Sequence, residues 1–189
     1  MGKLIYSMGV SLDGYIAGPD GTFDWSVPSQ ELHRFHNERA RGLACHLLGR
    51  NLYETMVYWE TADQDPELGE VEREFAGIWR ELPKVVFSTT LEEVEGKTRL
   101  VRDGVVEEVE RLKAEEGGDL GVGGAGLAAT LIKAGLVDEF QPFVYPVIVG
   151  GGTPFLPDLD EMFDLELVET QMFGSRVVSM RYQRRHQSM

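Results

Sequence analysis

Asp119-Leu120-Gly121-Val122-Gly123-Gly124-Ala125-Gly126 has the pattern of a short strand that runs into a glycine-rich turn. A helix is expected from Leu127 to about Ala134, with Gly135 placed to end it. Glycines let the backbone approach a ligand closely, and the free N–H groups of a helix N-terminus favour an anion. The segment predicts a diphosphate site, with a plain strand-to-helix turn as the alternative. The candidate contacts are Gly123, Gly124, Ala125, Gly126 and Leu127.

The same glycines satisfy the G-x-G-x-x-G motif of dinucleotide-binding Rossmann folds. Two features argue against that fold. The motif starts at residue 121 and not on the first strand of a long βαβ array. The acidic pair Asp138-Glu139 also comes too soon and begins a strand instead of ending one. We therefore expect a different α/β architecture.

Strands and helices alternate along most of the chain. Apolar runs predict strands at 3–12, 44–48, 84–88, 98–101, 119–122 and 137–149, and helical spacing predicts helices near 30–41, 50–56, 68–82, 105–112 and 127–134. The last 30 residues alternate apolar and polar positions around Phe173-Gly174-Ser175, which indicates an antiparallel hairpin. We predict one α/β domain over residues 1–189, a three-layer sandwich with a mostly parallel central sheet and a C-terminal antiparallel hairpin.

Composition restricts the partners and the compartment. The formal net charge of −14 argues against binding to nucleic acid or to anionic membranes. No apolar run approaches the roughly 18 residues that span a bilayer, and the N-terminus does not resemble a signal peptide. The single cysteine, Cys45, cannot form an intramolecular disulfide, which favours a reducing compartment. We expect a cytoplasmic protein whose partner is a small molecule.

Two further strand ends carry groups that suit an anion. Gly49-Arg50-Asn51 places a guanidinium at the start of a helix, which suits a phosphate monoester, although a surface arginine after a turn is common. Ser88-Thr89-Thr90 ends a strand in three hydroxyls, which can hold phosphate or ribose or can cap the next segment.

Two other groups of residues allow a functional and a structural interpretation. The loop Ser11–Gly18 combines glycines with large apolar residues, which suits a loop that closes over a flat ring, or an ordinary connection. His33 and His36 lie three apart on a helix, but no third metal ligand accompanies them. We interpret both histidines as surface or packing residues and predict no metal site.

Taken in order, these segments resemble the dihydrofolate-reductase-like superfamily. The resemblance is strongest to the C-terminal reductase domain of bifunctional riboflavin-biosynthesis deaminase-reductases and its stand-alone relatives. It rests on Ser11–Ala17, Gly49-Arg50, Gly123–Gly126 and Pro146–Pro154, of which the last matches the riboflavin type better than true dihydrofolate reductase. There is no basic cluster for the glutamate tail of folate or for the ribose phosphate of a riboflavin precursor.

The resemblance implies an NADPH-dependent reductase that transfers hydride to a small heterocycle resembling a pterin or a ribosylaminopyrimidine. Alternatives are a true dihydrofolate reductase and a non-catalytic NADP-binding protein on the same fold. By resemblance the cofactor's adenosine phosphate end would contact Gly49, Arg50, Asn51, Ser88 and Thr89. Its diphosphate would contact Gly123, Gly124 and Gly126, and its nicotinamide would lie beside Ile16 and Ala17.

The proton donor and the oligomeric state are less directly indicated. By resemblance to the carboxylate of dihydrofolate reductases, Glu31 is the candidate catalytic acid, with Asp13 and Asp24 as weaker alternatives. Relatives indicate a homodimer, and the β-rich stretch Phe140–Val149 is the expected edge for it.

Overall fold

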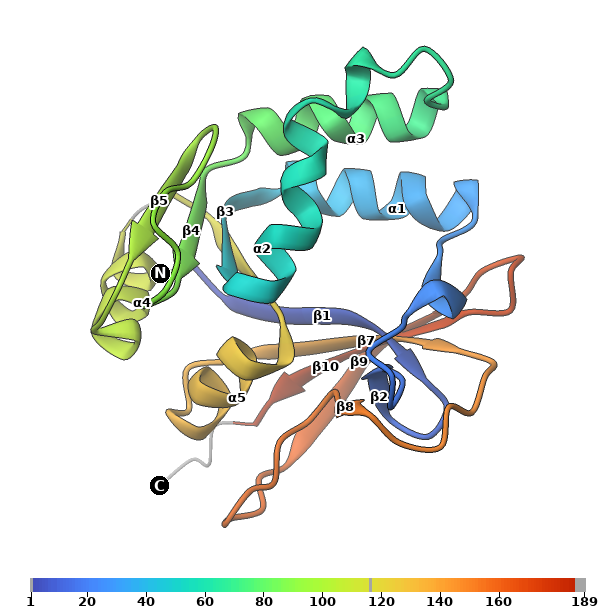
Figure 1. The fold of residues 1–189 in the computed structure, drawn as a ribbon. Helices are drawn as coiled ribbons and strands as arrows, with labels where there is room; N and C mark the ends of the chain where they lie inside the picture. Colours follow the sequence, from blue (N-terminus) through green and yellow to red (C-terminus); the bar gives the residue numbers. More distant parts are fainter. Residues whose placement is uncertain (1, 116, 186–189) are drawn as a thin grey trace.

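An eight-stranded sheet runs through the computed structural model, which describes residues 2–115 and 117–185 (Figure 1). Its strand order is β5-β4-β3-β6-β1-β7-β10-β9. The first six strands in this order are parallel, whereas β10 is antiparallel to β7 and to β9. The predicted α/β fold, with a mostly parallel sheet and a C-terminal antiparallel hairpin, is confirmed.

The elements follow the predicted order closely. The strands of the main sheet are β1 (Leu4–Ser11), β3 (Leu43–Gly49), β4 (Lys84–Phe87), β5 (Thr98–Val101), β6 (Asp119–Gly123), β7 (Glu139–Tyr145), β9 (Leu165–Met172) and β10 (Val178–Arg184). Two short strands, β2 (Tyr15–Ala17) and β8 (Thr153–Pro154), pair with each other in a second sheet. The α-helices are α1 (Gln30–Arg41), α2 (Arg50–Met56), α3 (Glu70–Glu81), α4 (Val105–Ala114) and α5 (Ala125–Lys133).

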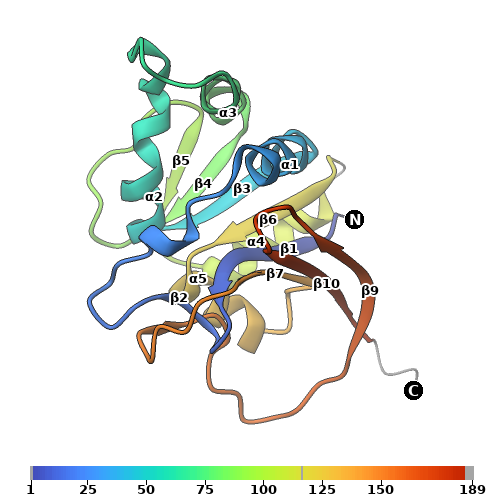
Figure 2. The same cartoon turned by 90° about the vertical axis from the view of Figure 1, so that its right-hand side faces the viewer.

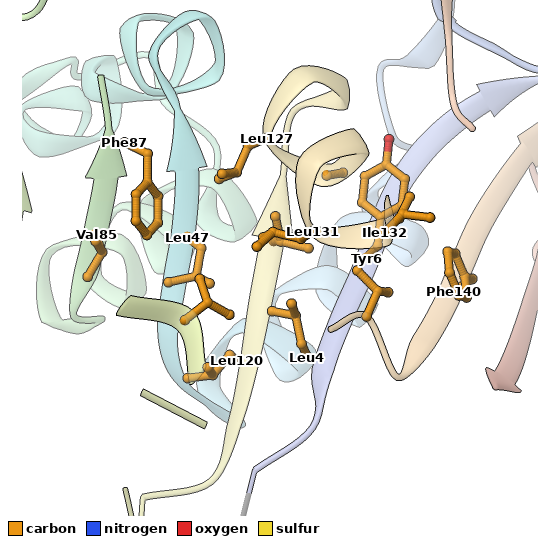
Figure 3. Packing of buried hydrophobic residues seen from close by; sticks show 14 of the residues in the cluster. Leu4, Tyr6, Leu47, Val85, Phe87, Leu120, Leu127, Leu131, Ile132 and Phe140 are labelled. Atoms are coloured by element: carbon orange, nitrogen blue, oxygen red, sulfur yellow. The ribbon is translucent and has the colours of Figure 1, made fainter. Parts of the chain in front are cut away.

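Helices cover both faces of the sheet because the buried strands are apolar on both sides. Leu47 and Val85 point into a large apolar cluster with α4 and α5, part of which is shown in Figure 3. The alternate residues Leu48 and Val86 point to the opposite face and pack against Trp79 of α3. Figure 2 shows α1, α2 and α3 together on this second face. Successive residues of a strand thus supply two separate layers of core.

The strand β7 differs from its prediction in length and in position. It ends at Tyr145 and does not continue to Val149. β7 also lies between β1 and β10, so both of its edges are paired. The expectation that residues 140–149 form a free edge for a dimer is therefore wrong; the free edges of this sheet belong to β5 and β9.

The helices are short and mostly amphipathic. Within residues 2–115 and 117–185, none combines the length and the apolar character that crossing a bilayer requires.

Candidate active site

Three parallel strands end side by side at one edge of the sheet. β3 lies between β4 and β6, with Gly49 opposite Phe87 and Leu48 opposite Gly123. The turns that follow these strands touch: a β-carbon added to Gly124 would lie 3.9 Å from the backbone nitrogen of Gly49. The structure thus places the turn at residues 49–51 beside the turn at residues 123–126. The predicted dinucleotide site requires both turns to lie close together. In open α/β sheets, ligands bind at this carboxyl edge of the strands.

A groove of about 810 Å³ lies along this edge, a volume that suits a cofactor. Every predicted cofactor contact lines it except Gly123, which faces a second cavity. Ile16 and Ala17 of β2 line the groove together with the turn after β3 and the start of α5. Segments from both halves of the chain therefore form one continuous wall.

The glycine turn presents main-chain N–H groups to the groove. Gly124 has a φ of 93°, a left-handed conformation that favours glycine, and it directly precedes α5. Ala125, Gly126 and Leu127 form the first turn of this helix, whose N–H groups have no partner within the helix. A β-carbon on Gly126 would meet nothing within 4 Å, so the space in front of it is open. Such a turn suits an anionic group.

Two guanidinium groups also line the groove, those of Arg50 and Arg102. Arg50 donates hydrogen bonds to Glu54 Oε1 at 2.9 Å and to Thr90 Oγ1 at 2.8 Å. Arg102 follows β5 and lies 3.5 Å from the carbonyl oxygen of Thr89. The sequence interpretation missed Arg102. The position of Arg102 directly after the predicted strand 98–101 could have identified it. This strand, β5, pairs in parallel with β4 and therefore ends at the same edge of the sheet.

Ser88 has a structural role in addition to its place in the groove. Its Oγ accepts hydrogen bonds from the backbone nitrogens of Thr90 at 3.2 Å and Leu91 at 3.1 Å. The capping interpretation of this hydroxyl is therefore confirmed, while ligand contact by Ser88 and Thr89 stays a prediction.

A second cavity of about 490 Å³, here called the inner chamber, lies between the sheet and the helices α1 and α3. It adjoins the groove, since Met8, Gly9, Leu52 and Met56 line both. Its other walls are mostly aromatic rings and imidazoles. They include His33 and His36 of α1, His46 of β3, Trp59, Phe75 of α3 and Phe143 of β7.

The imidazoles of the inner chamber are kept neutral by their surroundings. Burial lowers the pKa of His36 to about 4, with smaller contributions from His33 and Arg39. Burial likewise lowers the pKa of His46 to about 4, helped by Lys84. The pKa of His33 is also lowered by burial, although the charges of Glu72 and Glu74 oppose this. At neutral pH each imidazole therefore offers one hydrogen-bond donor and one acceptor.

His33 and His36 pack against aromatic rings, as the sequence predicted: His33 lies beside Trp59 and Phe75, and His36 lies beside Phe143. Both also line the inner chamber. His46 was not recognised from sequence; its neighbours explain its place, since Gly121 and Gly123 on β6 leave room for its ring. Among the residues the structure describes, no group of three histidine, cysteine or acidic side chains could hold a metal ion.

The three candidate acids lie outside both cavities. Glu31 is exposed, and its Oε2 accepts a hydrogen bond from the backbone nitrogen of Gly174 at 2.9 Å. Asp13 accepts hydrogen bonds from the backbone nitrogens of Val149 and Gly150. Asp24 is exposed in a short 3₁₀ turn. A catalytic role for Glu31 stays a prediction.

The fold and its strand topology are of the dihydrofolate-reductase-like type. A dihydrofolate reductase from Enterococcus faecalis, solved in complex with NADP(H), aligns with a TM-score of 0.62 at 18% identity over 97% of each chain. The chain belongs to the RibD C-terminal domain family, whose model matches residues 2–179.

A sequence relative and a further structural neighbour were also found. The chain is 33% identical over 183 residues to the uncharacterized protein YyaP of Bacillus subtilis, with 95% of this chain and 94% of YyaP covered. The diaminohydroxyphosphoribosylaminopyrimidine deaminase/5-amino-6-(5-phosphoribosylamino)uracil reductase of Thermotoga maritima aligns with a TM-score of 0.68 at 18% identity. That alignment covers 97% of this chain and 56% of the Thermotoga chain, and at such identity it establishes the fold alone.

Proposed function

We propose that this protein is an oxidoreductase that uses NADPH to reduce a small heterocyclic substrate. The observation that supports this most strongly is the junction of the two cavities. The groove and the inner chamber share Met8, Gly9, Leu52 and Met56, so a ring at the end of the groove can face a ring in the chamber. Reductases of this class depend on such juxtaposition, because the enzyme's main task is to orient two rings and exclude water.

The residues of the groove fit a phosphorylated dinucleotide. The N–H groups at Gly124–Leu127 would hold the diphosphate, while Arg50 and Arg102 would hold the phosphate on the adenosine ribose. Gly49, Asn51, Ser88 and Thr89 would line the same end, and Ile16 and Ala17 would cover the nicotinamide. When bound, the cofactor would supply the hydride.

The protein itself would supply the shape and polarity around the reacting ring. Glu31 remains the proton donor predicted by resemblance, and its carboxylate would have to release the Gly174 amide before it could act in the chamber. A non-catalytic NADP-binding role would not require the inner chamber, and for this reason we favour an enzyme.

Replacing Arg50 with alanine is expected to weaken NADPH binding about tenfold or more and to change NADH binding little. A charge-assisted hydrogen bond is worth about 1.5–3 kcal/mol, and only NADPH carries the phosphate that Arg50 would contact. Fluorescence titration of the tryptophans with each nucleotide measures both affinities. Arg34→Gln, which changes an exposed arginine on α1, is the control.

If the variant binds NADPH and NADH more weakly by the same factor, Arg50 does not contact the phosphate on the adenosine ribose. If the wild-type chain failed to bind either nucleotide, the proposed function would be rejected. Oxidation of NADPH on addition of dihydrofolate would instead favour the true dihydrofolate reductase.

A further inference from the structure

The inner chamber has a chemical character that differs from that of the groove. We propose that it takes an uncharged, flat nitrogen heterocycle that carries no phosphate group. This inference rests on the proposed function, because it names the class of substrate that the reductase would accept.

The walls of the chamber suit a flat ring. The rings of Trp59 and Phe75 meet edge to face with centroids 4.9 Å apart, and those of His36 and Phe143 meet in the same way at 4.5 Å. On the sheet side, β6 contributes glycine at both 121 and 123, and the side chains of Leu43, His46 and Leu52 lie over these glycines and form the floor there. Aromatic walls of this kind favour stacking and edge contacts with another ring.

The polar groups of the chamber suit the edge of a heterocycle. No hydrogen bond within the described part of the chain occupies the ring nitrogens of His33, His36 and His46. The nearest approach is His33 Nδ1 to Glu72 Oε1 at 3.9 Å, which is too long for a hydrogen bond. Three neutral imidazoles can pair with the ring N–H, ring nitrogen and carbonyl groups that alternate along such a heterocycle.

The charges of the chamber disfavour a phosphate group. Arg39 and Glu72 are the charged residues that line it in the described structure, and their formal charges cancel. The pKa of Arg39 is lowered by burial and by the charge of Arg181, while the carboxylates of Glu139, Glu169 and Asp119 oppose this shift. A phosphate monoester carries about −1.5 to −2 at pH 7, so burying one here would leave uncompensated negative charge.

The groove differs from the inner chamber in the charge of its lining residues. It is lined by two arginines, Arg50 and Arg102, and no carboxylate is among its described lining residues. The protein therefore places its cationic groups where the cofactor's phosphates would lie and leaves the substrate side nearly neutral. The Thermotoga protein of the same fold, by contrast, is named for a phosphoribosylated uracil.

Matched pairs of probes that differ only by a phosphate test this proposal. The full chain is titrated with 6-hydroxymethylpterin and its monophosphate, and with uridine and uridine 5′-monophosphate, by ligand-observed NMR. Each titration is performed with and without saturating NADP⁺. We expect at least one phosphate-free probe to bind, and to bind at least tenfold more tightly than its phosphorylated partner.

Variants then locate the bound probe. His36→Phe and His46→Phe keep a ring and remove its nitrogens, so each is expected to weaken the phosphate-free probe at least fivefold. Arg34→Gln on the exposed face of α1 should leave it unchanged. The comparison within each pair uses the wild-type chain, so it stays decisive even if a variant fails to fold.

The proposal is overturned if a phosphorylated probe binds as tightly as its partner, or if none of the four probes binds. Failure of the proposed function is visible separately. In that case NADP⁺ does not bind, whereas the titrations without nucleotide still report on the inner chamber.

Discussion

A Gly152→Ala variant is expected to lose about 3 kcal/mol of unfolding free energy and to bind NADPH at least tenfold more weakly. Gly152 has a φ of 120°, where residues other than glycine are strained by about 1–3 kcal/mol. An added β-carbon would also overlap the carbonyl oxygen of Ala17 and lie 2.5 Å from the carbonyl carbon of Gly18. These are backbone atoms, so the contact cannot be relieved by a side-chain rotation.

The weaker NADPH binding is expected because the close contact at Gly152 lies where β8 pairs with β2. Thr153 of β8 pairs with Ala17 of β2, and both residues line the groove beside Ile16. Separating β8 from β2 would displace the wall that is proposed to cover the nicotinamide. Urea unfolding measures the change in stability, and fluorescence titration with NADPH measures the change in affinity.

Gly150→Ala is the matched control in the same loop. Gly150 has a φ of 78°, but a β-carbon there would meet nothing within 4 Å. It should lose only about 1 kcal/mol through backbone strain and retain NADPH binding. If both variants behaved alike, strain alone and not contact with β2 would explain the need for glycine at 152.

The groove could largely be predicted from sequence because its parts are local. A strand that ends in glycine, followed by a helix start, is visible in Gly49-Arg50 and again in Gly123-Gly124. Parallel strands place all such ends at one edge of the sheet. Arg102 was not predicted in this way because it follows a short strand, 98–101, that has no glycine at its end.

The inner chamber could not be predicted because it depends on contacts between distant elements. His36 and His46 are ten residues apart in sequence, and nothing local shows that α1 lies over β3 and β6. The dimer edge was misjudged for the same reason. The β-rich stretch after Val137 gives no sign that the C-terminal strand β10 pairs with it.

Acidification is expected to destabilise the folded protein through His36 and His46. Burial holds the pKa of each imidazole at about 4 in the folded protein, against about 6.5 in an unfolded chain. Between these values the unfolded chain binds a proton at each histidine and the folded protein does not, so falling pH favours unfolding. From pH 7.5 to pH 5 the unfolding free energy should fall by about 2 kcal/mol per imidazole.

Urea unfolding at pH 7.5, 6.5, 5.5 and 5 measures this slope, which should become shallower in His36→Phe and in His46→Phe. Carboxylates contribute less in this window, since their ordinary pKa values lie near 4. A flat profile, or the wild-type slope in both variants, would mean that the imidazoles are charged in the folded protein. The inner chamber would then carry positive charge and could accept a phosphate. This measurement of stability thus tests, with no ligand present, the neutrality on which the proposed substrate class depends.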